Sequence, residues 1–507
     1  MPSLITNLNR CLIYSRNRSL VNSLIRIFSI CTVSLLSFSS TSVADEYLAN
    51  MMKIITPPQS QMAINVWDIE SNKSIYSLNE DTLLLPASIQ KVLTAVGATH
   101  QLGTDFYYQT QLLTNGEVVD NTLEGNVYFT FSGDPTFKRK HLSALIATFK
   151  EKGIKQISGK IILVGSQIKS VRAPGWAWDD LGICYAAPVS NFIIDRNCVR
   201  ATLTPLDDSS TTISVLSKYP INITTQARFN PLIKPKQATE HFCSLQMQRF
   251  DKNKYQLSGC YPGKKPIRLA IAVNDAPLYA SDMIEAMLSE QGIEFTNLQL
   301  TDVQLPKDLT LLAEHKSQTL PHLLKRMLEK SDNLIADSLL KKIGQSFFKQ
   351  HPLTQSVNYD NNGFVIGATA LQNILSELNL PFVEANLVDG SGLSRYNLLT
   401  SKQMLSVLQL IKIDKQFNYL EDLLPVAGKT GTLKYKDYFK QSPLKNQVSA
   451  KTGTMMGVDN LAGFITAENG KQYAFVIIEN GLSPKAKKTR LAPFSALFLQ
   501  TLNDLPQ

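Results

Sequence analysis

Two apolar hairpin patterns, one toward each end of the chain, constrain its fold more than any other feature. Residues 61–78 alternate apolar and polar around the turn Ser71-Asn72-Lys73, and residues 460–480 hold two apolar runs around Glu468-Asn469-Gly470. Both patterns predict antiparallel strands. From about residue 109 to 312 the chain instead has short β-like runs separated by Gly, Pro, Asp and Ser. A domain built from both ends can host an insertion at a surface loop, so we expect a discontinuous domain.

The length of 507 residues also requires more than one hydrophobic core. Helical patterns occur at 88–102, 319–345 and 365–379, on either side of the β-rich middle. We therefore expect helices and a sheet at both ends, with β-rich domains between them. The predicted boundaries are a leader at 1–44, an outer domain at 45–108 and 313–507, a first inserted domain at 109–203 and 275–312, and a small β domain at 204–274.

The first 44 residues have the pattern of a secretory signal. They hold four arginines and no lysine or acidic residue, then an apolar run from Ile27 to Phe38, and small residues ending at Ala44. We expect cleavage after Ala44 and export to the periplasm of a Gram-negative bacterium. The alternative is an uncleaved anchor, but an apolar run of about 12 residues is short for a membrane span. The mature chain has a net charge of +5, which suits an anionic polymer such as a cell wall.

Four cysteines remain after cleavage: Cys184, Cys198, Cys243 and Cys260. In an oxidising compartment, four thiols predict two disulfides, and three pairings are possible. We favour the two local pairs, Cys184–Cys198 and Cys243–Cys260. Free buried thiols are the alternative.

Ser88-Ile-Gln-Lys91 is the first candidate for chemistry. The pair is spaced so that both side chains share one helix face. A lysine amine with a lowered pKa can take the proton of a serine hydroxyl, which makes the serine a nucleophile. Ser-x-x-Lys also begins at Ser166, Ser338, Ser346 and Ser442, but only the Ser88 copy stands at the start of a strongly apolar helix after a hairpin.

Two further motifs follow. Ser331-Asp332-Asn333 lies inside a helical pattern, where its hydroxyl could relay a proton and its amide could hold a substrate carbonyl. Lys-Thr-Gly occurs twice, at 429–431 and 451–453. We choose Lys451 because the hairpin at 460–480 follows it closely and would hold its strand rigid. We interpret the first copy as a loop turn that uses Gly428 and Gly431.

In this order and spacing, the three motifs resemble those of serine-type D-alanyl-D-alanine carboxypeptidases, in particular class C low-molecular-mass penicillin-binding proteins. The 243 residues between Ser88 and Ser331 match the two inserted domains of that subgroup, and the similarity covers nearly all of the mature chain. Asp389-Gly-Ser-Gly-Leu-Ser-Arg395 and Ile194-Asp-Arg-Asn-Cys198 also resemble the subgroup. The resemblance implies the α/β (α+β) penicillin-recognising transpeptidase-like fold, in which helices flank a central antiparallel sheet.

The resemblance also implies the roles of the motif residues. Ser88 would attack the peptide carbonyl with Lys91 as base, and Ser331 and Lys451 would pass the proton to the leaving amine. Asn333 would hold the substrate amide. The N–H groups of Ser88 and Thr454 would form the oxyanion hole. Lys451, Thr452 and Thr454 would bind the substrate carboxylate. Gly453 would allow a substrate backbone to approach closely.

Three more residues are assigned by the same resemblance. Asp195 from the first inserted domain and Arg395 would bind the ammonium and carboxylate of a diaminopimelate side chain. An ion pair that braces two domains is the alternative reading of these two residues. Met456 would line the same pocket.

The expected activity is therefore cleavage of D-Ala-D-Ala ends and of cross-links in peptidoglycan, with β-lactams as covalent inhibitors. The alternatives are a β-lactamase, for which a Glu-x-x-Leu-Asn segment is missing between Ser331 and Lys451, and a non-catalytic penicillin-binding sensor. We expect no cofactor, no metal and no nucleic acid partner. Membrane association would be peripheral at most, and a homodimer is compatible with the sequence.

Overall fold

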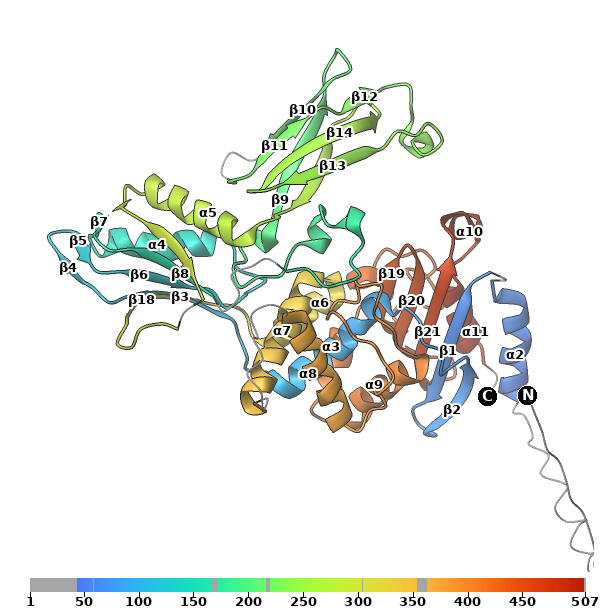
Figure 1. The fold of residues 1–507 in the computed structure, drawn as a ribbon. Coiled ribbons are helices and arrows are strands. Elements are labelled where there is room, and N and C mark those ends of the chain that lie inside the picture. Colours follow the sequence, from blue (N-terminus) through green and yellow to red (C-terminus); the bar gives the residue numbers. More distant parts are fainter. Residues whose placement is uncertain are drawn as a thin grey trace, which may run out of the picture.

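The computed structural model describes residues 43–505 except 58, 166–170, 216–218, 303 and 353–362. The predicted leader falls almost entirely on residues 1–42, outside the described residues. None of the helices in the described ranges combines the length and the apolar character needed to cross a bilayer. Figure 1 shows a large unit of helices and sheet that carries both ends of the described chain, and two smaller units built from the middle of the chain.

The large unit contains a five-stranded antiparallel sheet in the order β19-β20-β21-β1-β2. Its strands are β1 (Gln61–Asp68), β2 (Lys73–Leu78), β19 (Val448–Met455), β20 (Gly457–Thr466) and β21 (Gln472–Leu482). The two hairpins predicted from the sequence are both present. They join because β1 pairs with β21, with Gln61 opposite Asn480 and Asp68 opposite Tyr473. This pairing closes the domain around the insertion.

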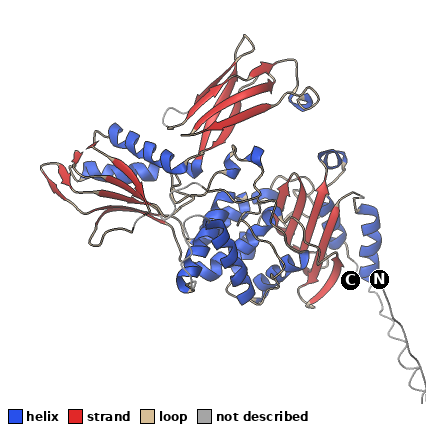
Figure 2. Ribbon diagram, viewed as in Figure 1, coloured by secondary structure: helices blue, strands red, loops and turns tan. Residues whose placement is uncertain are grey.

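Helices cover both faces of this sheet (Figure 2). Phe475 and Ile477 of β21 face the core formed with α2 (Val43–Ile55) and α11 (Phe494–Asn503). Val476 and Ile478 face the opposite core. That core is formed with α3 (Lys91–Leu102), α6 (Leu320–Lys330), α7 (Asn333–Gln350), α8 (Gly363–Glu377) and α9 (Ser401–Ile413). Burial on both faces explains why β21 is an almost continuous apolar run.

The first inserted unit is built on a sheet in the order β17-β8-β6-β3-β18, with a smaller sheet in the order β16-β7-β5-β4. The bounds are β3 (Gln109–Thr114), β4 (Glu117–Val119), β5 (Thr122–Glu124), β6 (Val127–Thr130), β7 (Gln156–Ile157), β8 (Ile161–Val164), β16 (Glu294–Phe295), β17 (Leu298–Thr301) and β18 (Thr310–Lys316). Two helices, α4 (Arg139–Glu151) and α5 (Ala276–Glu290), share its core, so this domain is less purely β than predicted. Its sheet also extends past the predicted boundary at 312, to the end of β18.

The small unit has two sheets. One is β10-β9-β15 and the other is β11-β14-β12 with β13 against β14. The bounds are β9 (Cys198–Pro205), β10 (Thr211–Val215), β11 (Asn222–Thr225), β12 (Arg228–Asn230), β13 (Leu245–Phe250), β14 (Lys254–Pro262) and β15 (Ile267–Ala272). Because β9 begins at Cys198, the unit starts before the predicted residue 204. The structure has both local disulfides, Cys184–Cys198 and Cys243–Cys260.

Candidate active site

Ser88 lies in a single 3-10 turn, Ala87–Gln90, that leads directly into α3. The predicted helix over 88–102 therefore starts one turn later as an α-helix, with Lys91 as its first residue. The Lys91 amine lies 2.8 Å from the Ser88 hydroxyl. Lys91 is fully buried, whereas Ser88 is half-buried and accessible from the surface. The turn thus places a buried amine directly behind a reachable hydroxyl.

The surroundings of Lys91 suit a general base. Its amine donates to Asn333 Oδ1 at 2.7 Å and to the Ser391 carbonyl at 2.6 Å. With two hydrogens held by these acceptors, the lone pair of the neutral amine faces the Ser88 hydroxyl. Burial lowers the pKa of Lys91 to about 8, against the opposing effect of nearby carboxylates, chiefly Asp337. A base with this pKa can accept a proton near neutral pH.

The Ser331-Asp332-Asn333 motif breaks the helix that the sequence predicts to run through it. Helix α6 ends at Lys330, Ser331 has a left-handed backbone with φ 54°, and α7 begins at Asn333. Asp332 caps α7 by accepting a hydrogen bond from Ile335 N at 3.3 Å. Aspartate is among the preferred N-cap residues because its carboxylate satisfies a free backbone N–H. The break lets Ser331 and Asn333 reach two different lysines.

Lys451 lies on β19 at the edge of the large sheet. Its buried amine is 2.9 Å from the Ser331 hydroxyl and donates to the Thr452 carbonyl at 2.8 Å. Burial, reinforced by the charge of Lys91, holds the pKa of Lys451 well below its usual range. Ser331 is therefore in hydrogen-bond contact with a second amine that can give or take a proton.

The outer edge of β19, away from β20, presents backbone donors. Ala450 N donates to the Pro425 carbonyl on this edge. Because backbone groups alternate along a strand, the N–H groups of Thr452 and Thr454 point the same way. A Cβ at Gly453 would lie 2.7 Å from the Pro86 carbonyl, so glycine lets β19 pack against the Ser88 turn. The role of Gly453 beside a substrate backbone stays a prediction.

The first Lys-Thr-Gly copy forms a turn that lies next to the second copy. Gly428 and Gly431 have φ of 69° and 58°, as expected for a tight turn, and Lys429 is exposed. The residue after this copy, Thr432, shares a hydrogen bond of 2.8 Å with Thr452. Thr432 was not predicted as a site residue, although the duplicated motif pointed to this segment.

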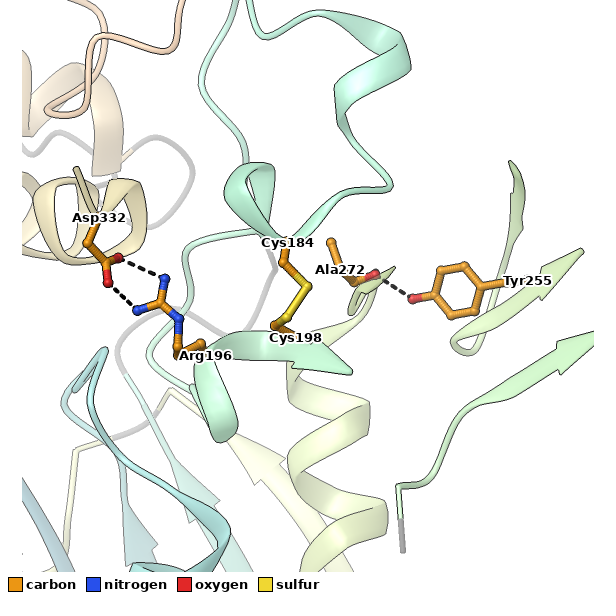
Figure 3. Close-up of a disulfide and its surroundings, with 6 residues drawn as sticks. All are labelled: Cys184, Arg196, Cys198, Tyr255, Ala272 and Asp332. Carbon is orange, nitrogen blue, oxygen red and sulfur yellow. Dashed lines mark hydrogen bonds and ion pairs between the residues drawn. A yellow bond between two sulfur atoms is a disulfide. The ribbon is translucent and has the colours of Figure 1, made fainter. Parts of the chain in front are cut away.

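The inserted domain also holds the Ser331–Asn333 turn, from two points linked by a disulfide. Asn333 Nδ2 donates to the Tyr185 carbonyl at 2.9 Å. The Arg196 guanidinium forms a two-point ion pair with Asp332, in which one of the two contacts measures 2.9 Å (Figure 3). Cys184 precedes Tyr185 and is bonded to Cys198, which follows Arg196 by two positions. Neither Tyr185 nor Arg196 was identified from the sequence.

Asp195 does not join Arg395. Its carboxylate accepts a hydrogen bond from the Arg139 backbone at 3.2 Å, at the start of α4, and it also interacts with Tyr219. Arg395 is exposed and donates to the Met456 carbonyl at 3.3 Å, and the Met456 side chain is 71% exposed. Arg395 and Met456 thus lie together at the end of β19, and Asp195 is held within the inserted domain.

Comparisons with known proteins agree with this geometry. The model of the D-Ala-D-Ala carboxypeptidase 3 (S13) family matches residues 47–501. A D-alanyl-D-alanine carboxypeptidase DacB of Haemophilus influenzae is 36% identical over 475 residues, covering 92% of this chain and 96% of that protein. A D-alanyl-D-alanine carboxypeptidase of Actinomadura is 26% identical over 467 residues, covering 85% and 80%.

Solved structures give the same result. The crystal structure of penicillin-binding protein 4 (dacB) from Haemophilus influenzae aligns with a TM-score of 0.79 at 35% identity, covering 90% of this chain and 98% of that one. The same protein complexed with a β-lactam aligns with a TM-score of 0.77 at 34% identity. The transpeptidase-like fold expected from the motifs is therefore confirmed. The chain belongs to the D-Ala-D-Ala carboxypeptidase 3 (S13) family of serine hydrolases.

Proposed function

We propose that this chain is a periplasmic D-Ala-D-Ala carboxypeptidase and DD-endopeptidase that acts through an acyl-enzyme on Ser88. One observation carries the proposal: Ser88 contacts a buried lysine of lowered pKa, and Asn333 and Ser331 connect that lysine to the edge strand bearing Lys451. Serine, amine base, hydroxyl relay and backbone donors are the parts that acyl transfer requires.

Acylation starts when neutral Lys91 takes the hydroxyl proton of Ser88. The Ser88 oxygen attacks the carbonyl carbon of the penultimate D-Ala, and the N–H groups of Ser88 and Thr454 stabilise the oxyanion. The C–N bond then breaks, and the leaving D-Ala amine takes the proton that Lys91 accepted, relayed by Lys451 and Ser331, so that Lys91 is neutral again. Water attacks the resulting ester with the same base, releases the shortened peptide and returns the proton to Ser88.

The substrate end fits the residues around β19. Lys451, Thr452 and Thr454 supply a positive charge and two hydroxyls for the terminal carboxylate. Arg395 beside Met456 supplies a guanidinium for a second carboxylate further along the peptide. For the side-chain ammonium we assign Asp180 in place of Asp195, because Asp180 accepts a hydrogen bond from Tyr185, whose carbonyl contacts Asn333.

The test is to locate the acylated serine. After incubation with a β-lactam, mass spectrometry should find the adduct on Ser88, and Ser88→Ala should abolish both the adduct and hydrolysis of a D-Ala-D-Ala peptide. Ser338→Ala is the matched control, because Ser338 also precedes a buried lysine, Lys341, whose pKa burial lowers to about 7. An adduct on Ser338, or turnover by Ser88→Ala, would overturn the assignment. Fast release of the β-lactam would indicate a β-lactamase instead.

A further inference from the structure

A large cavity lies between the small domain and the segment that leads to Tyr185. Its volume is about 1120 Å³, and it is lined by β13, β14 and β15 on one side and by residues 178–179 and 181–183 on the other. Figure 1 shows β13 and β14 at the face of the small domain that looks toward the large unit. None of the residues assigned to the reaction lines this cavity, so it is separate from the site described above.

Three arginines line the cavity: Arg172, Arg249 and Arg268. Within the described ranges, none of them forms an ion pair, although Asp179 and Asp251 also belong to the lining. Arg172 donates to Asn274 Oδ1 at 3.2 Å, but its buried Nε has no hydrogen-bond partner. Buried polar groups in proteins normally have partners. Guanidinium groups without carboxylates are suited to a ligand that brings its own.

The rim adds a flat apolar surface. Trp178 is 80% exposed, and the Arg249 guanidinium lies over its ring at 4.8 Å. Ile183 is 39% exposed on the same segment. A large exposed aromatic side chain next to cations is typical of a binding surface, since such a residue is costly to leave in water.

A short chain of contacts connects the cavity to the reacting groups. Trp178 and Asp179 line the cavity, and the next residue, Asp180, accepts a hydrogen bond from the Tyr185 hydroxyl. The Tyr185 carbonyl in turn accepts a hydrogen bond from Asn333. The cavity wall and the contact with Asn333 therefore belong to one continuous segment, residues 178–185.

We infer that this cavity is an accessory site for the carboxylate-bearing stem peptide of a second, cross-linked peptidoglycan strand. The inference rests on the proposed function, because it extends the same substrate. Arg249 and Arg172 bind the free carboxylates of the stem, and Trp178 packs against its backbone or sugar. A short D-Ala-D-Ala peptide does not reach the cavity, so the site selects cross-linked wall over short peptides.

The experiment compares two substrates on Arg249→Gln and Trp178→Ala. For a purified cross-linked muropeptide dimer, Arg249→Gln should raise KM about tenfold, the usual effect of one lost charge-assisted contact, and Trp178→Ala should also raise KM, because it removes an aromatic contact surface. For a D-Ala-D-Ala tripeptide, and for β-lactam acylation, the variants should match the wild type. Arg249→Lys should recover part of the loss, because it keeps the charge.

Arg228→Gln is the matched control, an exposed arginine of the same domain that does not line the cavity. The inference is overturned if the variants leave the dimer KM unchanged, as they would if the cavity served another protein. It is also overturned if they slow the dimer and the tripeptide equally. Failure of the proposed function would appear separately, as a wild-type enzyme that cleaves neither substrate.

Discussion

Replacing Arg196 by glutamine should slow acylation although Arg196 does not touch the reacting atoms. Arg196 pairs with Asp332, whose side chain is only 2% exposed and which stands between Ser331 and Asn333. The substitution removes the charge and leaves a shorter, polar side chain. We expect the Ser331–Asn333 turn to shift when its buried carboxylate loses this partner.

The structure sets the size of the effect. Removing one partner of a buried ion pair costs about 3–5 kcal/mol of unfolding free energy. Arg196 is 33% exposed, and Arg326 remains 3.4 Å from Asp332. We therefore expect the loss of unfolding free energy to fall below this range, at about 2 kcal/mol. A displacement of about 1 Å in a catalytic group can cost on the order of 100-fold in rate. We therefore expect acylation to slow between about 10-fold and 100-fold.

Stopped-flow measurement of acylation by a fluorescent penicillin provides the rate, and thermal unfolding provides the stability. Arg490→Gln is the matched control, because Arg490 forms a comparable two-point pair with Glu479, which is 1% exposed, and contacts none of the assigned catalytic residues. Arg490→Gln should lose at least as much stability as Arg196→Gln, because the Arg490 side chain is only 14% exposed, yet only Arg196→Gln should acylate slowly. Wild-type acylation by Arg196→Gln, with the stability loss present, would refute the positioning role.

Three further outcomes follow from the site. The acylation rate should rise as the pH increases through about 8, because the pKa of Lys91 is about 8 and only its neutral amine can accept a proton. An acylation rate that falls over this pH range would exclude Lys91 as the base. Lys451→Ala should reduce peptide turnover at least about 100-fold, whereas Lys429→Ala, in the first Lys-Thr-Gly motif, should leave turnover unchanged. Equal effects of the two substitutions would contradict the assignment of the second motif to the active site. Replacing Cys184 and Cys198 by alanine should cost about 3 kcal/mol and slow acylation, whereas removal of the other disulfide should affect stability alone.

The parts of the fold that could be predicted depend on local periodicity. Both hairpins were predicted because two-residue alternation and turn residues are local properties of the sequence. Helix α4 could also have been found, since Leu142, Leu145, Ile146 and Phe149 repeat at helical spacing and are buried. The short β-like runs on either side of α4 led to the prediction of a β-rich domain. The helical periodicity of α4 itself was missed.

The catalytic pairs were predictable to different degrees. Ser88 and Lys91 are three residues apart, so helical geometry alone brings them together. The contacts of Asn333 with Tyr185 and of Asp332 with Arg196 span 148 and 136 residues, and no local pattern reports such pairings. The break at Ser331 depends on Asp332 as an N-cap, a signal hidden because Leu334 and Ile335 follow it directly and continue the helical pattern.

The contacts of the Ser331–Asn333 turn make the first inserted domain part of the proposed catalytic machinery. Asn333 uses its oxygen to accept from Lys91 in the large unit and its nitrogen to donate to Tyr185 in the inserted one. Asp332 is a buried charge whose two-point partner, Arg196, also comes from the insertion. A chain with the insertion deleted would keep all three motifs but would leave a buried carboxylate with only Arg326 beside it. Because an uncompensated buried charge is strongly destabilising, such a deletion should misplace Asn333, and with it the hydrogen bond that orients Lys91 toward Ser88.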